Sequence, residues 1–169
     1  MATKSPKQLE DLFHETLKDM YYAEKKILAE LPKMAKAAHS DELRAAFQKH
    51  EGETEEQVNR LEQVFEAIDQ PAKGKTCDAI NGIIDEAKEF MKEFKDSPAL
   101  DASLIAAAQA VEHYEISRYG TLKTWAAQLG LQEAADLLEE TLDEEKNTDQ
   151  LLTDLAQSAV NEEAQRSAA

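Results

Sequence analysis

The sequence is poor in cysteine, proline and glycine, and these shortages already narrow the choice of fold. A single cysteine, Cys77, excludes an intrachain disulfide and a cysteine-based zinc motif. With only 5 glycines and 4 prolines, the chain has little room for loops, and no run of alternating β-branched residues between turn signals predicts a strand. Ala, Leu, Glu, Lys and Gln dominate instead, a composition that is typical of an all-α protein.

Long hydrophobic runs and basic residues are scarce as well. No uninterrupted apolar stretch is long enough to cross a bilayer, and the first residues lack the apolar core of a signal peptide. With 19 Lys and Arg against 35 Asp and Glu, the formal net charge is −16, and such a surface repels nucleic acid and anionic membranes. We therefore expect a soluble, cytoplasmic protein that binds neither nucleic acid nor membranes.

Helical periodicity is what the sequence has in abundance. Apolar residues recur at spacings of three and four along four long segments, with a shorter fifth segment between the second and the third. The pattern predicts helices near residues 5–38, 41–69, 76–95, 99–129 and 131–161, all within a single domain that spans 1–169. Ser40 is expected to cap the second helix and Gly130 to end the fourth. The predicted fold is an all-α, antiparallel four-helix bundle with an additional helix in the long crossover connection.

Each long segment carries acidic residues in the middle of its otherwise apolar stripe. These residues are Glu24, Glu53, Glu112, Glu115, Glu145 and Asp149. In so acidic a chain one glutamate on one stripe is expected by chance, but four coincidences at matched depth favour a shared site. Like charges packed inside a bundle would repel one another. Two divalent cations would supply the missing positive charge, as in the di-iron and di-manganese carboxylate bundles.

Several nearby residues allow two interpretations. His50 is either a nitrogen ligand or a hydrogen-bonded core histidine. Tyr119 either hydrogen-bonds a ligating carboxylate or packs in the core, and Gln57 is equally open. On the last long helix, Glu144 competes with the adjacent Glu145 for the inward position.

Four short stretches carry a resemblance to a known family. They are YYAEKK at 21–26, HEGET at 50–54, EHYE at 112–115 and ETLDEEKNTD at 140–149. Through them the chain closely resembles the YciF/YciE-like stress proteins of the ferritin-like superfamily over essentially its whole length. The resemblance implies a ferritin-like bundle, a homodimer and a dinuclear metal site akin to that of rubrerythrins.

The ligand pattern of rubrerythrins can be carried over residue by residue. It falls on Glu24, Glu53, Glu112, Glu115 and Glu145. The sequence departs from it where the pattern has the histidine of Glu-x-x-His, because Glu56 and Thr148 stand at those two positions. His50 and Asp149 are the candidates to replace the missing histidines.

The sequence therefore predicts a stress-linked protein that holds two iron or manganese ions and reacts with dioxygen or hydrogen peroxide. Mostly oxygen ligation, with at most one histidine, favours these hard ions over zinc or copper. The alternative is a non-catalytic metal-binding or structural protein of the stress response that engages other proteins. Ferritin-like mineral storage would need a hollow cage, of which the sequence gives no sign.

Overall fold

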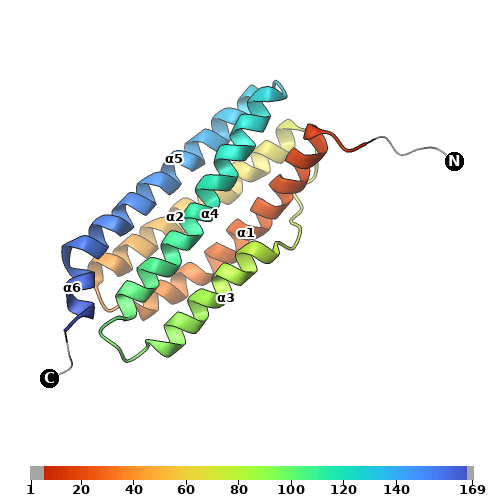
Figure 1. Ribbon diagram of the computed structural model, residues 1–169. Coiled ribbons are helices and arrows are strands. Elements are labelled where there is room, and N and C mark those ends of the chain that lie inside the picture. Colours follow the sequence, from red (N-terminus) through yellow and green to blue (C-terminus); the bar gives the residue numbers. More distant parts are fainter. Residues whose placement is uncertain (1–5, 167–169) are drawn as a thin grey trace.

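The computed structural model describes residues 6–166, and nearly all of this segment is helical (Figure 1). Its α-helices are α1 (Leu9–Ala37), α2 (Asp41–Ala67), α3 (Asp78–Glu93), α4 (Leu100–Gln128), α5 (Gln132–Leu155) and α6 (Asn161–Ala164). α1, α2, α4 and α5 form the bundle, and α3 lies in the long connection between α2 and α4. The predicted all-α bundle with an additional crossover helix is confirmed.

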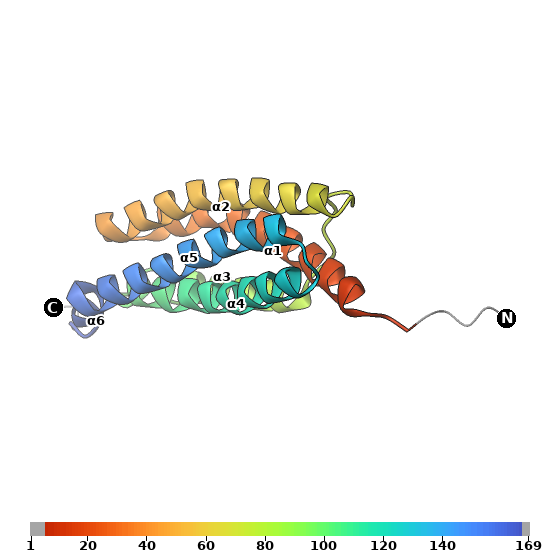
Figure 2. The same ribbon diagram turned by 90° about the horizontal axis from the view of Figure 1, so that it is seen from above.

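The four long helices pack as two antiparallel pairs. Seen from above, α1 and α2 lie on one side of the molecule, and α4 and α5 on the other (Figure 2). α2 also packs against α5 and α1 against α4, while α3 covers the side formed by α1 and α4. No helix in the described part of the chain combines the length and the hydrophobicity that crossing a bilayer requires.

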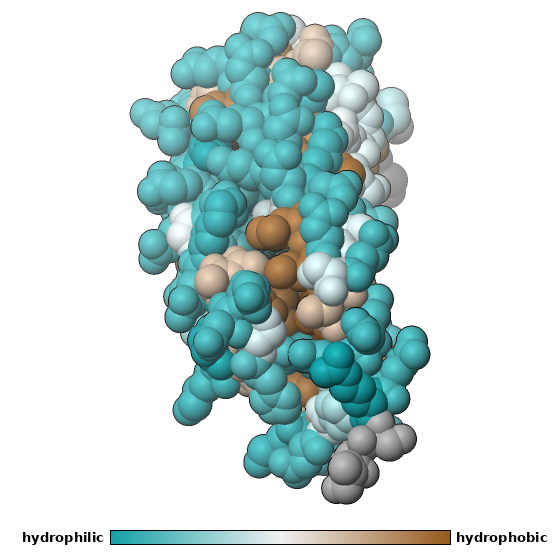
Figure 3. Space-filling view, turned by 90° about the vertical axis from the view of Figure 1, so that its left-hand side faces the viewer, coloured by the Kyte–Doolittle hydropathy of each residue, from teal (hydrophilic) through white to brown (hydrophobic). Residues whose placement is uncertain are grey.

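Apolar side chains from all of the long helices and from α3 fill one continuous core. Its largest fully buried members include Tyr119, Phe13, Phe47, Phe65, Met20 and Leu104. Charged residues cover most of the outside. Figure 3 shows one face on which hydrophilic residues surround a narrow band of hydrophobic ones.

The start of the first helix follows from local hydrogen bonding. α1 begins at Leu9, four residues after the predicted start, and Ser5 lies outside the described residues. Gln8 takes the N-cap position, and its backbone N–H donates to the Asp11 carboxylate over 2.8 Å. This capping box satisfies helix-end groups that the sequence pattern alone does not locate.

The other helix ends combine predicted and unpredicted features. The Ser40 side chain accepts a hydrogen bond from the backbone N–H of Leu43, as expected for the N-cap of α2. Gly130 has a φ of +76°, which allows the tight turn from α4 into α5. The last long helix does not run unbroken to residue 161, because Ala156–Val160 forms a π-helical turn. Such a turn rotates the side chains that follow it, and its last residue is buried in the core.

Candidate metal centre

The mid-helix carboxylates converge inside the bundle around one histidine. His50 from α2, Glu112 and Glu115 from α4, and Glu145 from α5 each place one potential ligand atom within 4.8 Å of the other three. We call these four residues the His50 cluster. His50 Nε2 lies 3.3 Å from Glu112 Oε1 and 3.8 Å from Glu145 Oε2. All four side chains are buried inside the bundle.

Glu24 on α1 extends the cluster on the side of Glu115. Its side chain is fully buried, Tyr119 donates a hydrogen bond to its Oε1, and its Oε2 has no hydrogen-bond partner. Burial raises the pKa of Glu24 to about 7. Burial, together with the charges of Glu24 and Glu145, raises the pKa of Glu115 well above its ordinary value. At neutral pH and without metal, this end of the cluster therefore holds protons.

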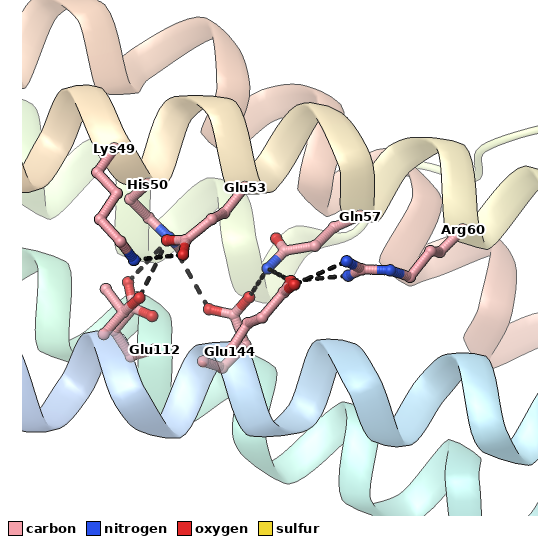
Figure 4. A network of polar contacts seen from close by, with 9 residues as sticks. Lys49, His50, Glu53, Gln57, Arg60, Glu112 and Glu144 are labelled. Carbon is pink, nitrogen blue, oxygen red and sulfur yellow. Dashed lines mark hydrogen bonds and ion pairs between the residues drawn. The ribbon is translucent and has the colours of Figure 1, made fainter.

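Glu53 lies at the edge of the cluster, in a more polar setting. Its Oε2 is 3.7 Å from His50 Nδ1, and its Oε1 accepts a hydrogen bond from the exposed Lys49 (Figure 4). The nearby His50, followed by the hydrogen bond from Lys49, lowers the pKa of Glu53. With 24% of its side chain exposed, Glu53 is an ionised group that connects the cluster with solvent.

His50 carries the positive charge of the metal-free cluster. Burial opposes its protonation, but Glu112, Glu53 and Glu145 together raise its pKa well above the ordinary value. The imidazolium supplies positive charge that partly balances the surrounding carboxylates. Binding of a cation there would require His50 to lose its proton and offer a ring nitrogen.

Glu145 is held in place through Gln57, which belongs to a row of polar residues with Glu144 and Arg60 (Figure 4). The Gln57 amide, fully buried, donates hydrogen bonds to Glu145 and, over 3.1 Å, to Glu144 Oε2. Arg60 in turn donates two hydrogen bonds of 2.7 Å to the Glu144 carboxylate. Glu144 is thus neutralised by an arginine outside the cluster, and Glu145 is the inward residue of the two.

Sequence reasoning left the role of Gln57 open and did not foresee the pairing of Arg60 with Glu144. A signal was present, because Arg60 follows Gln57 by three residues and so lies on nearly the same face of α2. The partner on α5 depends on how the two helices are rotated against each other, which the sequence pattern does not fix.

Asp149 lies outside the His50 cluster. Its carboxylate accepts a hydrogen bond of 3.0 Å from Gln109 and lies 3.2 Å from His113 Nε2. Thr148, the residue before it, occupies the inner position, with its Oγ1 3.5 Å from His50 Nδ1. Glu145 and Thr148 therefore define the side of α5 that faces the cluster.

The His50 cluster and the adjoining Glu24 contain an unusual number of buried polar atoms without hydrogen-bond partners. They are Glu24 Oε2, His50 Nε2, Glu112 Oε2, both oxygens of Glu115 and Glu145 Oε2. Buried polar atoms in native proteins are nearly always hydrogen-bonded, and each exception costs about 1–3 kcal/mol. Carboxylate oxygens with one imidazole are ligands suited to iron and manganese. The donor set therefore fits the metal site that the resemblance implies.

Comparison with models of protein families shows which family the chain belongs to. The model of the family described as "Domain of unknown function (DUF892)" matches residues 8–165. The chain belongs to this family. Protein YciF from Escherichia coli (strain K12) is 47% identical over 163 residues, which cover 96% of this chain and 98% of YciF. The resemblance to the YciF-like stress proteins is confirmed.

Solved structures agree with this assignment. The crystal structure of the E. coli stress protein YciF matches with a TM-score of 0.88 and 48% identity, over 92% of this chain and 99% of that one. YcfI from Rhodopseudomonas palustris matches with a TM-score of 0.84 and 42% identity, over 90% and 98% of the two chains. A protein from Xanthomonas campestris, at 22% identity and a TM-score of 0.72 over 91% and 94%, shares the fold.

Proposed function

We propose that this member of the DUF892 family is a stress-linked, ferritin-like protein that holds two iron or manganese ions and reacts with dioxygen or hydrogen peroxide. The observation that carries the proposal is the concentration of unpartnered carboxylate and imidazole atoms in the His50 cluster and at Glu24. When ionised, the four buried glutamates Glu24, Glu112, Glu115 and Glu145 would carry as much negative charge as two divalent cations balance. The similarity to the stress protein YciF supports the link to stress.

The geometry suggests how the residues would divide between two ions. His50, Glu112 and Glu145 would hold one ion, and Glu24 would hold the other with Glu115, which lies within reach of both. Glu53, 3.7 Å from His50, would add a ligand once it releases Lys49. When bound, two ferrous ions would supply two electrons to dioxygen, giving hydrogen peroxide with two protons, or to hydrogen peroxide, giving two waters with two protons.

The protein's own groups would position the ligands and move protons. Tyr119 fixes Glu24, and Gln57 fixes Glu145, each through a hydrogen bond; such outer contacts orient ligands and tune their affinity. Glu24 and Glu115 hold protons in the metal-free protein because their pKa values are raised. Those protons would leave on metal binding, so the affinity for metal should rise with pH.

Metal loading of the purified protein tests the proposal. After anaerobic loading with ferrous or manganous ions, elemental analysis should find about two ions per chain, as in carboxylate bundles. Glu145→Ala should remove most of this binding. The matched control is Glu139→Ala, which changes an exposed residue of the same helix that pairs with Lys123. A stoichiometry near zero, or equal losses in both variants, would refute the site.

A second candidate is a non-catalytic metal-binding or structural protein of the stress response. The similar protein YcfI is described as a candidate structural protein, and that description favours this alternative. Mixing the ferrous-loaded protein with dioxygen or hydrogen peroxide separates the two. Bound iron that is oxidised faster than free iron, and again after each re-reduction with an added chemical reductant, supports the first function, while bound iron that reacts no faster than free iron supports the second.

We also propose, from the YciF/YciE resemblance, that the chain forms a homodimer in the cytoplasm. The hydrophobic band on the face shown in Figure 3 offers an apolar contact surface, and Leu151 on α5 is a large hydrophobic residue with 36% of its surface exposed. Analytical ultracentrifugation should give the mass of two chains. A single-chain mass at micromolar concentration would contradict the dimer.

A further inference from the structure

A small apolar cavity reaches the His50 cluster from the side of the bundle that α3 covers. Its volume is about 30 Å³, and α1, α3 and α4 form its wall. Most of the wall is apolar and includes Ile27, Leu31, Ile84, Ala87, Ala108 and Val111. The three polar residues of the wall are Glu30 on α1, His50 on α2 and Glu112 on α4. We call it the α3 cavity.

The size and the lining of the α3 cavity select one kind of occupant. A volume of 30 Å³ has room for about two water-sized molecules or one diatomic molecule. Water and hydrogen peroxide lose hydrogen bonds when they enter an apolar passage, whereas dioxygen has none to lose. Two polar atoms of the lining residues, His50 Nε2 and Glu112 Oε2, are buried without hydrogen-bond partners.

The opposite approach to the cluster is polar. On the side of α2, the partly exposed Glu53 and the exposed Lys49 form an ion pair next to His50 (Figure 4). Charged and hydrogen-bonding species would be accommodated there at lower cost than in the α3 cavity. The two approaches to one site therefore differ in the polarity of what they admit.

We propose that the α3 cavity, between α1, α3 and α4, is the entry and binding site for dioxygen, which it delivers to metal held beside His50 and Glu112. This inference rests on the proposed function and narrows it, because it names dioxygen as the oxidant that uses this path. It also gives the crossover helix a role, since Ile84 and Ala87 of α3 form part of the cavity wall.

Xenon binding tests the cavity independently of metal. Xenon is a neutral, apolar probe, so crystals of the metal-free wild type under xenon pressure should show it in the α3 cavity. Ala87→Leu fills the cavity with three more carbon atoms and should exclude xenon. Ala79→Leu makes the same change at an exposed position of α3 and should leave xenon bound. Absence of xenon from the wild-type cavity would overturn the proposal.

Oxidation kinetics of the ferrous-loaded protein test the path itself. Ala87→Leu should slow oxidation by dioxygen several-fold, leave oxidation by hydrogen peroxide unchanged and bind as much iron as the wild type. Ala79→Leu should match the wild type with both oxidants, and Ala87→Val, a smaller change, stands in should the leucine variant fail to fold.

The outcomes separate the two proposals. Normal iron binding with an unchanged dioxygen rate in Ala87→Leu would overturn the role of the α3 cavity alone. A wild type that binds no iron would overturn the proposed function and this inference with it.

Discussion

Replacing Glu24 by glutamine should stabilise the metal-free protein at alkaline pH and leave it unchanged at acidic pH. Glutamine has the shape of a protonated glutamate, and its carbonyl oxygen can still accept the hydrogen bond from Tyr119. Burial raises the pKa of Glu24 from an ordinary 4.5 to about 7. At about 1.4 kcal/mol for each unit of pKa, the ionisation of this group opposes folding by about 3 kcal/mol.

The direction of the pH effect follows from proton binding. Between pH 4.5 and 7 the folded protein keeps the proton on Glu24, whereas the unfolded chain releases it. The folded state binds more protons there, so the free energy of unfolding falls as pH rises through this window. His50 acts in the same direction, because its raised pKa stabilises the fold at low pH and this stabilisation is lost at higher pH. The metal-free wild type should therefore be more stable near pH 5 than near pH 8.

Urea unfolding in the presence of a chelator measures this effect. Near pH 5 the wild type and Glu24→Gln should unfold at similar urea concentrations, whereas near pH 8 the variant should be more stable by up to about 3 kcal/mol. Glu139→Gln, at an exposed position, should show no such pH-dependent gain. If the stability difference between wild type and Glu24→Gln is the same at both pH values, Glu24 does not hold a proton in the folded protein and the reasoning fails.

Three further substitutions test other parts of the structure. Glu115→Leu should stabilise the metal-free protein by about 1–3 kcal/mol, because both buried carboxylate oxygens of Glu115 lack hydrogen-bond partners. In thermal melts, the variant should also lose the stabilisation that manganous ion gives relative to chelator. A metal-free variant less stable than the wild type would contradict this prediction. Arg60→Met should cost about 1–2 kcal/mol in urea unfolding, since the partly buried Glu144 loses two hydrogen bonds, and an unchanged midpoint would show that solvent screens this pair. Gly130→Ala should cost about 1 kcal/mol in the same assay because φ is +76° there, and full stability would disprove the strain.

The sequence pattern predicts the fold because the spacing of apolar residues and the positions of the acidic residues are enough to specify a helical bundle. An apolar stripe interrupted by one glutamate specifies which face of the helix is buried and how far along the helix the glutamate lies. Glu24, Glu112, Glu115 and Glu145 were each predicted to face the core, and each is buried there. Antiparallel packing then brings the midpoints together, which is why a cluster could be predicted without knowledge of any contact.

What the pattern could not fix is the rotation of each helix to within one residue. On α5, Thr148 lies inside and Asp149 half outside, although the pattern predicts Asp149 on the inner stripe, because three and four residues are nearly equivalent on a helix. On α2, His50 is 3% exposed and Glu53 24%, although the pattern gave Glu53 the central role. Partners across helices, such as Arg60 with Glu144, depend on the same small rotations.

The sequence pattern also does not predict that the site has one apolar and one polar side, because this difference depends on where α3 packs. A bundle of four helices alone would leave the seam between α1 and α4 open to solvent, and α3 covers that seam with Ile84 and Ala87. Among the described residues, α3 makes no comparable contact with α2 or α5, and across the seam between these two helices Arg60 donates hydrogen bonds to Glu144. A buried carboxylate cluster that needs protons and cations from one direction and a neutral gas from another would require this asymmetry. If the crossover helix serves that purpose, substitutions on its inner face should change reaction rates with dioxygen before they change the amount of metal bound.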